Sequence, residues 1–548
     1  MHASLKRVTH KTLIFLHKWL GVSLALLFLM WFVSGVVLYF VPFPALTQVE
    51  RLAGLPPLQL PKDCCMTAEQ VSSSAGLKIS EARLGMHEGK AVWRLLGKPA
   101  NGAQAAPQWQ AFDAKSGQLL QPLASQAAME VAEAFSGRKA AHAELLERDQ
   151  WTVPQGLNPH RPFQRVEMQG GDGLELYVSP GAAEVVRDTR RAERFWNWLG
   201  AVPHWIYFTE LRRYPDAWHN VIVWLSIPGV ILAVTGIVLG TWHLFLNRVR
   251  WIPYRTFWMK WHHIGGLAAA TFTLTWIFSG LLSMNPFGVF SPTVASVAER
   301  AQWLGQNSSI TLTSAQALTQ AQASVPGFEA KELDLLQVAG QSWYRLRGAT
   351  SQALVRADNP PGKAPDVTTA LPDDVMQASL RKLRPDAEQA GNPVIARLTE
   401  YDNLYYAREL TSNTPHTRPL PVWRAQWVDG VSMYADPASA RLLLRTDAST
   451  SWKRLLYNGL HSFDFAPLIA RPWLRNTLVL LLSLLGTVLC VTSCVIAWRT
   501  LKPKTATQKA RYNRRHDQSH PPHPPAQPHL PRPGTGSAPA GAGRGTWQ

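Results

Sequence analysis

The sequence contains little cysteine and little negative charge. Four of its 548 residues are cysteine, and the absence of a Cys-x-x-Cys-His segment excludes covalent attachment of a c-type haem and a cysteine-based zinc module. Cys64 and Cys65 are adjacent, and because neighbouring cysteines rarely bridge each other, we expect unpaired or loosely paired thiols there. Asp and Glu number 37 against 55 Lys and Arg, which leaves a formal net charge of +18.

The excess positive charge is concentrated in three short segments, residues 6–18, 248–260 and 499–515. Each of them borders a long uncharged run. Because short loops rich in Lys and Arg remain in the cytoplasm, we predict that both termini lie inside the cell and that residues 43–216 and 287–472 lie outside. Membrane topology therefore explains the charge, and we expect no nucleic acid partner.

Long uncharged runs divide the chain, although its mean hydropathy is −0.09. They span residues 19–48, 221–247, 264–298 and 476–498. Each holds at least the ~20 residues that cross a bilayer core of roughly 30 Å, which predicts four transmembrane helices. The first run is too long for a signal-peptide core and is expected to remain as an anchor. The predicted order is a cytoplasmic N-terminus with the first helix (1–42), an outer domain (43–216), the second helix (217–247), a cytoplasmic loop (248–260), the third helix (261–286), another outer domain (287–472), the fourth helix (473–499) and a disordered cytoplasmic tail (500–548).

The two halves of the chain share a pattern. His17-Lys-Trp-Leu-Gly21 opens the first run and Met259-Lys-Trp-His262-His-Ile-Gly-Gly266 opens the third, so that His17 matches His262 at an offset of 262 − 17 = 245. The same offset matches four further pairs: Gly21 with Gly266, Trp31 with Trp276, Ser34 with Ser279, and Gly35 with Gly280. A second offset, 461 − 204 = 257, matches five pairs: His204 with His461, Leu211 with Leu468, Ser226 with Ser483, Gly229 with Gly486, and Thr235 with Thr492. The matches predict two parallel repeats of helix, outer domain and helix.

Four histidines therefore occupy matched positions, His17 and His262 toward the cytoplasm and His204 and His461 toward the outside. Parallel repeats are normally related by an axis along the membrane normal, so His17 is expected to face His262, and His204 to face His461. Two imidazoles saturate a haem iron, whereas a closed zinc site needs about four ligands, and the predicted helices contain no Asp or Glu. We therefore predict a haem at each pair, with small residues such as Gly35 leaving room for the macrocycle.

Three other histidines are alternates. His219 lies closer to the predicted membrane than His204 and competes with it as a ligand. His263 follows His262 and lies ~100° away around the helix, so the two are not expected to reach the same iron. His243 lies near the end of the second run, and both His243 and His263 are expected to be interfacial residues.

The outer segments show the alternation and turn signals of α+β domains. In the first, Thr67 is a candidate N-cap for a helix from residue 68. Further elements are expected as a helix at 129–135, a turn at 113–117, and strands at 91–96, 109–112, 118–120, 165–167, 174–178 and 185–186. The second segment predicts helices at 315–323 and 375–383, strands at 343–347, 422–428, 431–434 and 441–444, and a turn at 436–440.

Several motifs together are typical of one family: His17-Lys-Trp-Leu-Gly21, Trp261-His262-His-Ile-Gly-Gly266, His204-Trp-Ile-Tyr-Phe-Thr-Glu-Leu-Arg212, Asn458-Gly-Leu-His461-Ser-Phe-Asp-Phe465, and the turns Asp113-Ala-Lys-Ser-Gly117 and Asp436-Pro-Ala-Ser-Ala440. With them the chain resembles bacterial PepSY-associated transmembrane proteins, and within these the ferrisiderophore reductases of the inner membrane. The resemblance covers about residues 10–500. The second turn departs from the family pattern because it lacks the usual glycine.

The resemblance implies two periplasmic PepSY-like domains, b-type haem in the helix bundle, and reduction of ferric siderophores on the periplasmic side of the bacterial inner membrane for iron uptake. An unknown donor (a quinol, a flavin or a soluble protein) would supply the electrons. Two alternatives from other classes are a siderophore transporter and a non-enzymatic sensor or scaffold built on the outer domains. Five outer residues could hold the chelate but are expected mainly to pack: Trp343, Arg345, Trp423, Arg424 and Trp427.

Overall fold

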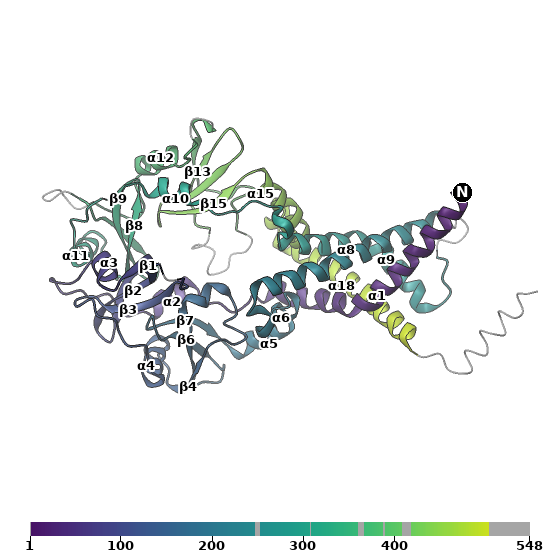
Figure 1. Ribbon diagram of the computed structural model, residues 1–548, viewed down its shortest axis with the longest axis horizontal. Helices are drawn as coiled ribbons and strands as arrows, with labels where there is room; N and C mark the ends of the chain where they lie inside the picture. The colour runs from purple at the N-terminus through teal and green to yellow at the C-terminus, as the bar shows by residue number, and fades with distance from the viewer. Residues whose placement is uncertain are drawn as a thin grey trace, which may run out of the picture. The chain divides into compact units, whose positions relative to one another are not determined.

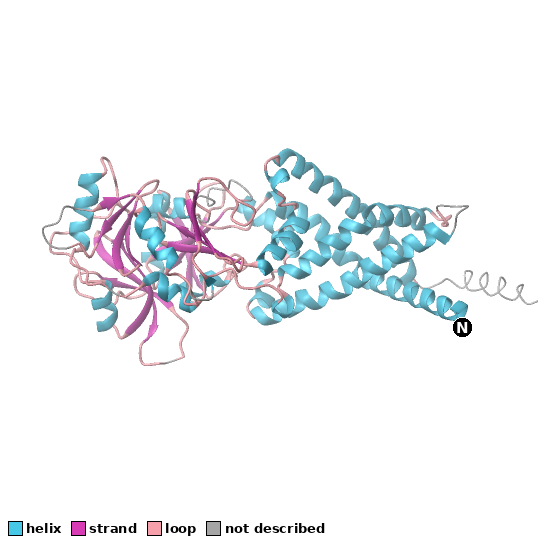
Figure 2. Ribbon diagram, turned by 90° about the horizontal axis from the view of Figure 1, so that it is seen from above, coloured by secondary structure: helices cyan, strands magenta, loops and turns pink. Residues whose placement is uncertain are grey.

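The computed structural model describes residues 2–102, 104–246, 252–306, 308–359, 366–386, 390–407 and 418–502. Of the predicted C-terminal tail, everything from residue 503 onward lies outside the described residues, as do residues 248–251 of the basic link between the second and third helices. Residues 1–497 form one compact unit. It consists of a bundle of long helices with a strand-rich region at one end of the bundle (Figures 1 and 2).

Four helices are long and apolar enough to cross a membrane, as the uncharged runs predict. They are α1 (His2–Phe40), α8 (Pro215–Leu246), α9 (Phe257–Ser283) and α18 (Pro472–Leu501). They lie side by side, and the N-terminus is at the end of the bundle away from the strands (Figures 1 and 2). Helix α1 begins before its uncharged run because Lys and Arg are good helix formers, and α9 ends at Ser283, well before the end of its run at residue 298.

Aromatic and small residues pack the interior of the bundle. Phe28 and Phe32 of α1 form a buried cluster with Ile277 of α9 and Cys490 of α18. Gly486 lies directly against the Phe32 ring, since a Cβ atom at that glycine would come 2.0 Å from a ring carbon. Small residues at such contacts let membrane helices approach closely.

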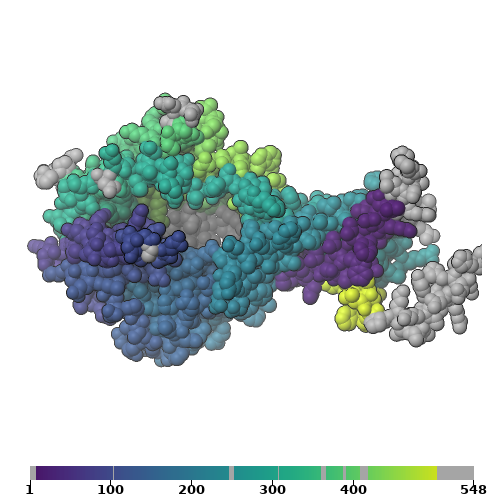
Figure 3. Space-filling view, in the orientation of Figure 1, coloured from purple at the N-terminus to yellow at the C-terminus, as the bar shows by residue number. Residues whose placement is uncertain are grey.

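The outer segments share one antiparallel sheet of seven strands, in the order β11-β10-β9-β8-β1-β2-β3. The strands are β1 (Leu77–His87), β2 (Lys90–Pro99), β3 (Gln108–Asp113), β8 (Glu332–Val338), β9 (Gln341–Arg347), β10 (Gln352–Arg356) and β11 (Val367–Thr368). Strand β1 of the first segment pairs with β8 of the second at Arg83 with Asp334 and at Leu84 with Leu333. The segments predicted as separate domains are therefore joined edge to edge, and their surfaces meet along this junction (Figure 3).

Each outer segment also has a four-stranded antiparallel sheet of its own. The first contains β4 (Ala140–Leu146), β5 (Phe163–Met168), β6 (Glu175–Ser179) and β7 (Glu184–Thr189), and the second contains β12 (Val394–Leu398), β13 (Val422–Gln426), β14 (Ser432–Asp436) and β15 (Arg441–Thr446). The helices of these segments include α3 (Ala68–Ser74), α4 (Ser125–Ser136), α11 (Ser314–Ser324) and α12 (Asp373–Arg381). Thr67 caps α3 as predicted, in a capping box with Gln70.

Shorter helices complete the described residues. They are α2 (Gln48–Gly54), the 3₁₀ helix η1 (Gln155–His160), α5 (Arg191–Leu199), α6 (Ala201–His204), α7 (Thr209–Arg212), the 3₁₀ helix η2 (Pro286–Gly288), α10 (Val297–Leu304), α15 (Ala448–Lys453), the π-helix η3 (Arg454–Gly459), α16 (Leu460–Ser462) and α17 (Ala466–Ile469). Helices α5 to α7 precede α8, and α15 to α17 precede α18. The segments that lead into α8 and α18 therefore both consist of short helices.

Two local predictions are wrong. Residues 118–120 do not form a strand. After the turn, the chain pairs with β3 at one position alone, where Leu119 forms an isolated antiparallel bridge with Phe112. Cys64 and Cys65 form a disulfide rather than remaining as thiols. Adjacent side chains point apart in an extended strand, but these two residues lie outside any strand and their Cα atoms are 3.1 Å apart.

Buried charges lie where β1 and β8 meet. The carboxylates of Glu184 and Glu332 are 2% and 1% exposed. Glu332 accepts hydrogen bonds from Arg51 at 2.8 Å and from Arg83 at 3.3 Å and also contacts Arg347, while Glu184 accepts from Arg83 at 2.7 Å. Burial alone would raise the pKa of both carboxyls, but the guanidinium groups outweigh it, lowering the pKa of Glu184 to about 2 and that of Glu332 well below its usual value.

Candidate functional site

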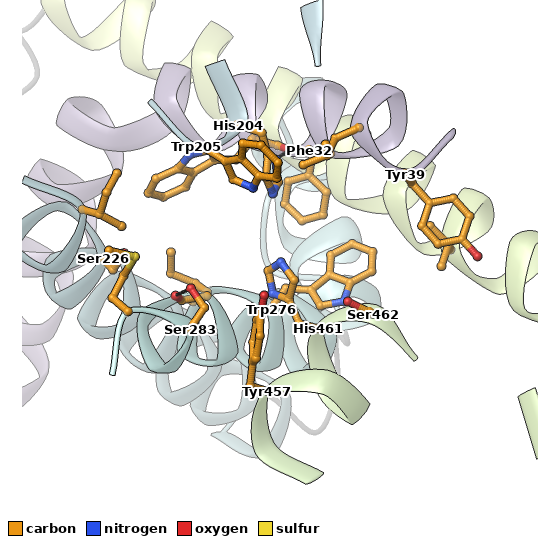
Figure 4. A pocket seen from close by; sticks show the side chains of 18 of the residues that line it. Phe32, Tyr39, His204, Trp205, Ser226, Trp276, Ser283, Tyr457, His461 and Ser462 are labelled. Atoms are coloured by element: carbon orange, nitrogen blue, oxygen red, sulfur yellow. Dashed lines mark hydrogen bonds between the residues drawn. The ribbon is translucent and has the colours of Figure 1, made fainter. Parts of the chain in front are cut away.

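The outer pair of matched histidines meets at the end of the bundle that carries the strands. His204 ends α6 and His461 lies in α16, and their ring centroids are 6.3 Å apart with the planes inclined by 59°. Both line a cavity of about 820 Å³ whose wall includes Phe32, Trp276 and Tyr457. Figure 4 shows the two imidazoles reaching into this cavity from opposite sides. Its volume lies within the ~300–1,000 Å³ that is typical of cofactor sites.

The inner pair has the same separation. His17 of α1 and His262 of α9 have ring centroids 6.3 Å apart, with the planes inclined by 46°. The His17 ring packs directly against α8: a Cβ atom at Gly236 would come 2.8 Å from Cε1 of His17. Both pairings are those that the matched positions predict.

Hydrogen bonds fix which ring nitrogen of each histidine is protonated. Nδ1 of His17 lies 3.3 Å from the Leu232 carbonyl, and Nδ1 of His204 lies 3.2 Å from the Trp31 carbonyl. A carbonyl oxygen can only accept, so in both rings Nδ1 carries the hydrogen. The neutral ring then has its lone pair on Nε2, the nitrogen available to a metal.

The same assignment holds for the other two rings, through hydroxyl groups. Ser279 donates its hydrogen to the Trp276 carbonyl at 3.0 Å, so its oxygen accepts from Nδ1 of His461 at 3.1 Å. Thr492 and Ser493 both donate to the Leu489 carbonyl, so their oxygens accept from Nδ1 of His262, each at 3.3 Å. All four imidazoles therefore hold Nδ1–H toward the protein and leave Nε2 as the basic nitrogen.

The serines and threonines that orient the rings occupy matched positions. Ser34 lies 3.3 Å from Nδ1 of His204, and the matched Ser279 lies 3.1 Å from Nδ1 of His461. Thr235 lies 3.4 Å from Nδ1 of His17, and the matched Thr492 lies 3.3 Å from Nδ1 of His262. The two offsets match these pairs in the sequence, but sequence reasoning assigned them no role. Outer groups of this kind set the tautomer and basicity of metal-binding histidines.

The spacing of each pair suits a metal held between two imidazoles. Half of the 6.3 Å separation is about 3.15 Å. A metal–imidazole bond is about 2.0–2.1 Å long, which leaves about 1.1 Å from the bonded nitrogen to the ring centre, the radius of an imidazole. The residues present therefore fit a bis-histidine haem iron at both pairs. Burial lowers the pKa of His204 to about 4, so this ring is neutral at physiological pH, as a ligand must be.

The three alternate histidines do not join either pair. His219 lies on α8 and is not among the residues that line the outer cavity. His243 and His263 instead face one another, with ring centroids 6.4 Å apart, and His263 lies 5.5 Å from Tyr254. His10 of α1 lies 5.6 Å from His243 and completes this group, which the sequence did not suggest.

The outer residues suggested as chelate contacts mainly pack. Trp343, Trp423 and Trp427 are 0%, 5% and 3% exposed and belong to one hydrophobic core. Arg345 is paired with Asp334, and Arg424 with Asp402 at 3.2 Å.

Fold and site together define an integral membrane protein with four apolar helices, three β-sheets and two facing pairs of histidines. Residues 14–499 match the family model for the PepSY-associated TM region, and the chain belongs to this family. No curated protein matches the chain. Among solved structures, a lipoprotein from Clostridium difficile 630 is 14% identical over 22% of this chain and 88% of its own, with a TM-score of 0.11.

Proposed function

We propose that the protein is a haem b-containing reductase of the bacterial inner membrane that passes electrons to ferric siderophores in the periplasm and so releases Fe(II) for iron uptake. The observation that carries the proposal is the geometry of the two histidine pairs. Each pair has ring centroids 6.3 Å apart, and each ring turns Nδ1 toward a protein acceptor. A purely structural histidine has no need of this doubled arrangement.

The proposal includes two parallel repeats with periplasmic PepSY-like outer domains and cytoplasmic termini. Backbone conformation at matched positions supports the repeat. Ala183 and Ala440 (440 − 183 = 257) both have positive φ, 51° and 53°, and so do Ile206 and Phe463 (463 − 206 = 257), 49° and 54°. Residues other than glycine rarely adopt this conformation. The described parts of the basic segments, which favour the cytoplasm, lie at the start of α1, before and at the start of α9 and at the end of α18, at the end of the bundle away from the strands (Figure 1).

The protein's own residues would bind, orient and shield the cofactor. His17 with His262 and His204 with His461 would hold the iron through Nε2, and the hydroxyl and carbonyl groups at Nδ1 would fix the ring orientation. Phe32 and Trp276 would exclude water from the outer site. Haem bound at the two pairs would supply one-electron transfer between the faces of the membrane. Reduction releases the metal because the hard oxygen donors of siderophores bind Fe(II) more weakly than Fe(III).

The visible spectrum of the purified protein tests the cofactor. We expect a dithionite-reduced α-band of bis-histidine b haem and about two haems per chain in a pyridine haemochrome assay. His17→Ala and His461→Ala should each remove about one haem, whereas His219→Ala, the matched control, should retain both. A colourless preparation, or full haem content in both test variants, would reject the proposal.

Reductase activity needs a separate test. Under anaerobic conditions, the reduced protein should be reoxidised by a ferric hydroxamate or catecholate chelate, and a ferrous-specific dye should trap one Fe(II) for each electron lost. A haem-loaded protein that stays reduced would be a cytochrome b with a different acceptor.

A further inference from the structure

A second cavity of about 370 Å³ adjoins the outer histidine site. Most of the side chains that line it are polar: Thr293, Tyr406, Arg418, Thr446, Thr450, Lys453, Arg454, Tyr457, Asn458, Ser462 and Asp464, with Leu404 and Leu444. Four of them, Tyr406, Arg418, Tyr457 and Ser462, also line the larger cavity, so the two spaces share a wall. The Tyr457 ring lies 5.7 Å from that of His461. A molecule in the second cavity is therefore separated from the outer pair by one aromatic side chain.

The charge of this cavity is positive. Among the described residues that line it, Arg418, Lys453 and Arg454 contribute three cations, against the single carboxylate of Asp464. That carboxylate accepts from Tyr406 at 3.1 Å and lies 3.7 Å from Arg475, outside the cavity lining. Among the described residues, no hydrogen bond or ion pair engages the ammonium group of Lys453. A partly enclosed cation without a carboxylate partner favours an anionic ligand.

The first half of the chain has aromatic residues at the corresponding positions. At the offset of 257, Lys453 corresponds to Trp196 (453 − 257 = 196), Ser462 to Trp205 (462 − 257 = 205) and Asp464 to Tyr207 (464 − 257 = 207). Trp205 and Tyr207 pack against each other at 5.4 Å and against Phe43 at 6.1 and 5.7 Å. Polar residues at these positions therefore occur in the second half alone, and the short helices that lead into a membrane helix do not require them.

We propose that this cavity, which we call the cationic vestibule, is the docking site of the substrate and that it selects ferric chelates with net negative charge and exposed carboxylate or phenolate oxygens. The inference rests on the proposed reductase function and adds to it the charge class of the substrate and its place beside His461. Lys453 is the main determinant of the selection, and Asn458 and Ser462 add hydrogen-bonding groups.

Binding is tested without electron transfer by using gallium(III) citrate, an anionic chelate of a metal that is not reduced. Isothermal titration of the full-length, haem-loaded protein in nanodiscs should show binding that weakens as salt rises, because the attraction is electrostatic. Lys453→Glu should weaken it at least about tenfold and Lys453→Arg by much less. Lys98→Glu makes the same charge change on an exposed part of β2 and should leave the affinity unchanged. A neutral chelate, tris(acetohydroxamato)gallium(III), should bind the unaltered protein more weakly than the citrate complex does.

The outcomes separate this inference from the proposed function. Equal weakening by Lys453→Glu and Lys98→Glu, or salt-independent binding, would overturn the vestibule even if the haem spectrum is as expected. Loss of haem rather than of chelate affinity in Lys453→Glu would also overturn it, because the cation would then serve a haem propionate. Lys453→Trp, which introduces the residue of the first half, provides a second test: chelate binding should be lost while haem content stays at the level of the unaltered protein.

Discussion

Substituting Gly236 by alanine is expected to disable the inner histidine pair without unfolding the protein. The new Cβ would lie 2.8 Å from Cε1 of His17, whereas carbon atoms in contact are usually about 3.5–4.0 Å apart, so the ring must move by about 0.7 Å or more. The movement is away from α8, the helix that carries the acceptors of Nδ1. The bond to the Leu232 carbonyl, 3.3 Å now, would lengthen to about 4.0 Å, beyond hydrogen-bonding range.

The expected loss of haem affinity follows from the loss of the hydrogen bonds that orient the His17 ring. Removing the partners of a metal-binding histidine typically costs about 10–100-fold in affinity, or about 1.4–2.8 kcal/mol. The helix itself should become more stable by about 0.5–1 kcal/mol, because alanine replaces glycine in a helix interior. Loss of haem in this variant therefore cannot be attributed to unfolding of α8.

The rate at which haem leaves for apomyoglobin, together with the haem count per chain, measures the change. Gly280→Ala is the matched control, since its Cβ would lie 3.6 Å from Cε1 of His461, an ordinary contact. We expect one haem to leave at least tenfold faster in Gly236→Ala and no change in Gly280→Ala. Two equally retained haems in Gly236→Ala would show that His17 does not hold iron in the position that the structure gives it.

Two further results are expected. Thr492→Val and Ser493→Ala each leave His262 one hydroxyl acceptor, so haem titration should show that the double variant loses more affinity than the sum of the single losses. Unfolding of the outer region, followed by tryptophan fluorescence, should depend on pH through Glu184: its pKa is lowered to about 2, so its contribution is complete above the ordinary value of 4.5 and is lost as the pH falls toward 2. Glu184→Gln should flatten this part of the pH profile and destabilise the protein by about 3–5 kcal/mol at neutral pH, because it leaves Glu332 as the one carboxylate for Arg51 and Arg83 and removes the carboxylate beside the buried Arg94; an unchanged melting temperature would contradict the reasoning.

The membrane helices and the histidine pairs follow from the sequence because both have simple signals. Twenty or more uncharged residues specify a membrane helix almost independently of context, and two fixed offsets name the histidines that face each other. The serines and threonines at Nδ1 lie at the same offsets, but their role depends on rotamers and on which carbonyl takes the hydroxyl hydrogen. No spacing rule in the sequence contains that information.

The pairing of strands, within and between the two outer segments, could not be predicted from the sequence in the same way. Strand β4 reads Ala-Ala-His-Ala-Glu-Leu-Leu, a set of good helix formers, and becomes a strand because β5 offers it an edge to pair with. The pairing of β1 with β8 joins residues about 250 positions apart and leaves no local pattern. The cationic vestibule is likewise built from loops and short helices whose lining residues are scattered between 293 and 464.

The seam between β1 and β8 has a consequence for how the two halves depend on each other. Arg83 of β1 pairs with Asp334 of β8, and the two residues are 334 − 83 = 251 positions apart. The bends that follow the two strands, at Glu88 and Ala339, are separated by the same number, 339 − 88 = 251. Arg83 and Asp334 therefore occupy equivalent positions in the two halves. A strand that pairs with its own counterpart forms the isologous contact of a twofold dimer. A chain cut after α8 would therefore expose β1 as a bare edge, and we expect it to recover that partner by associating with a second copy of itself.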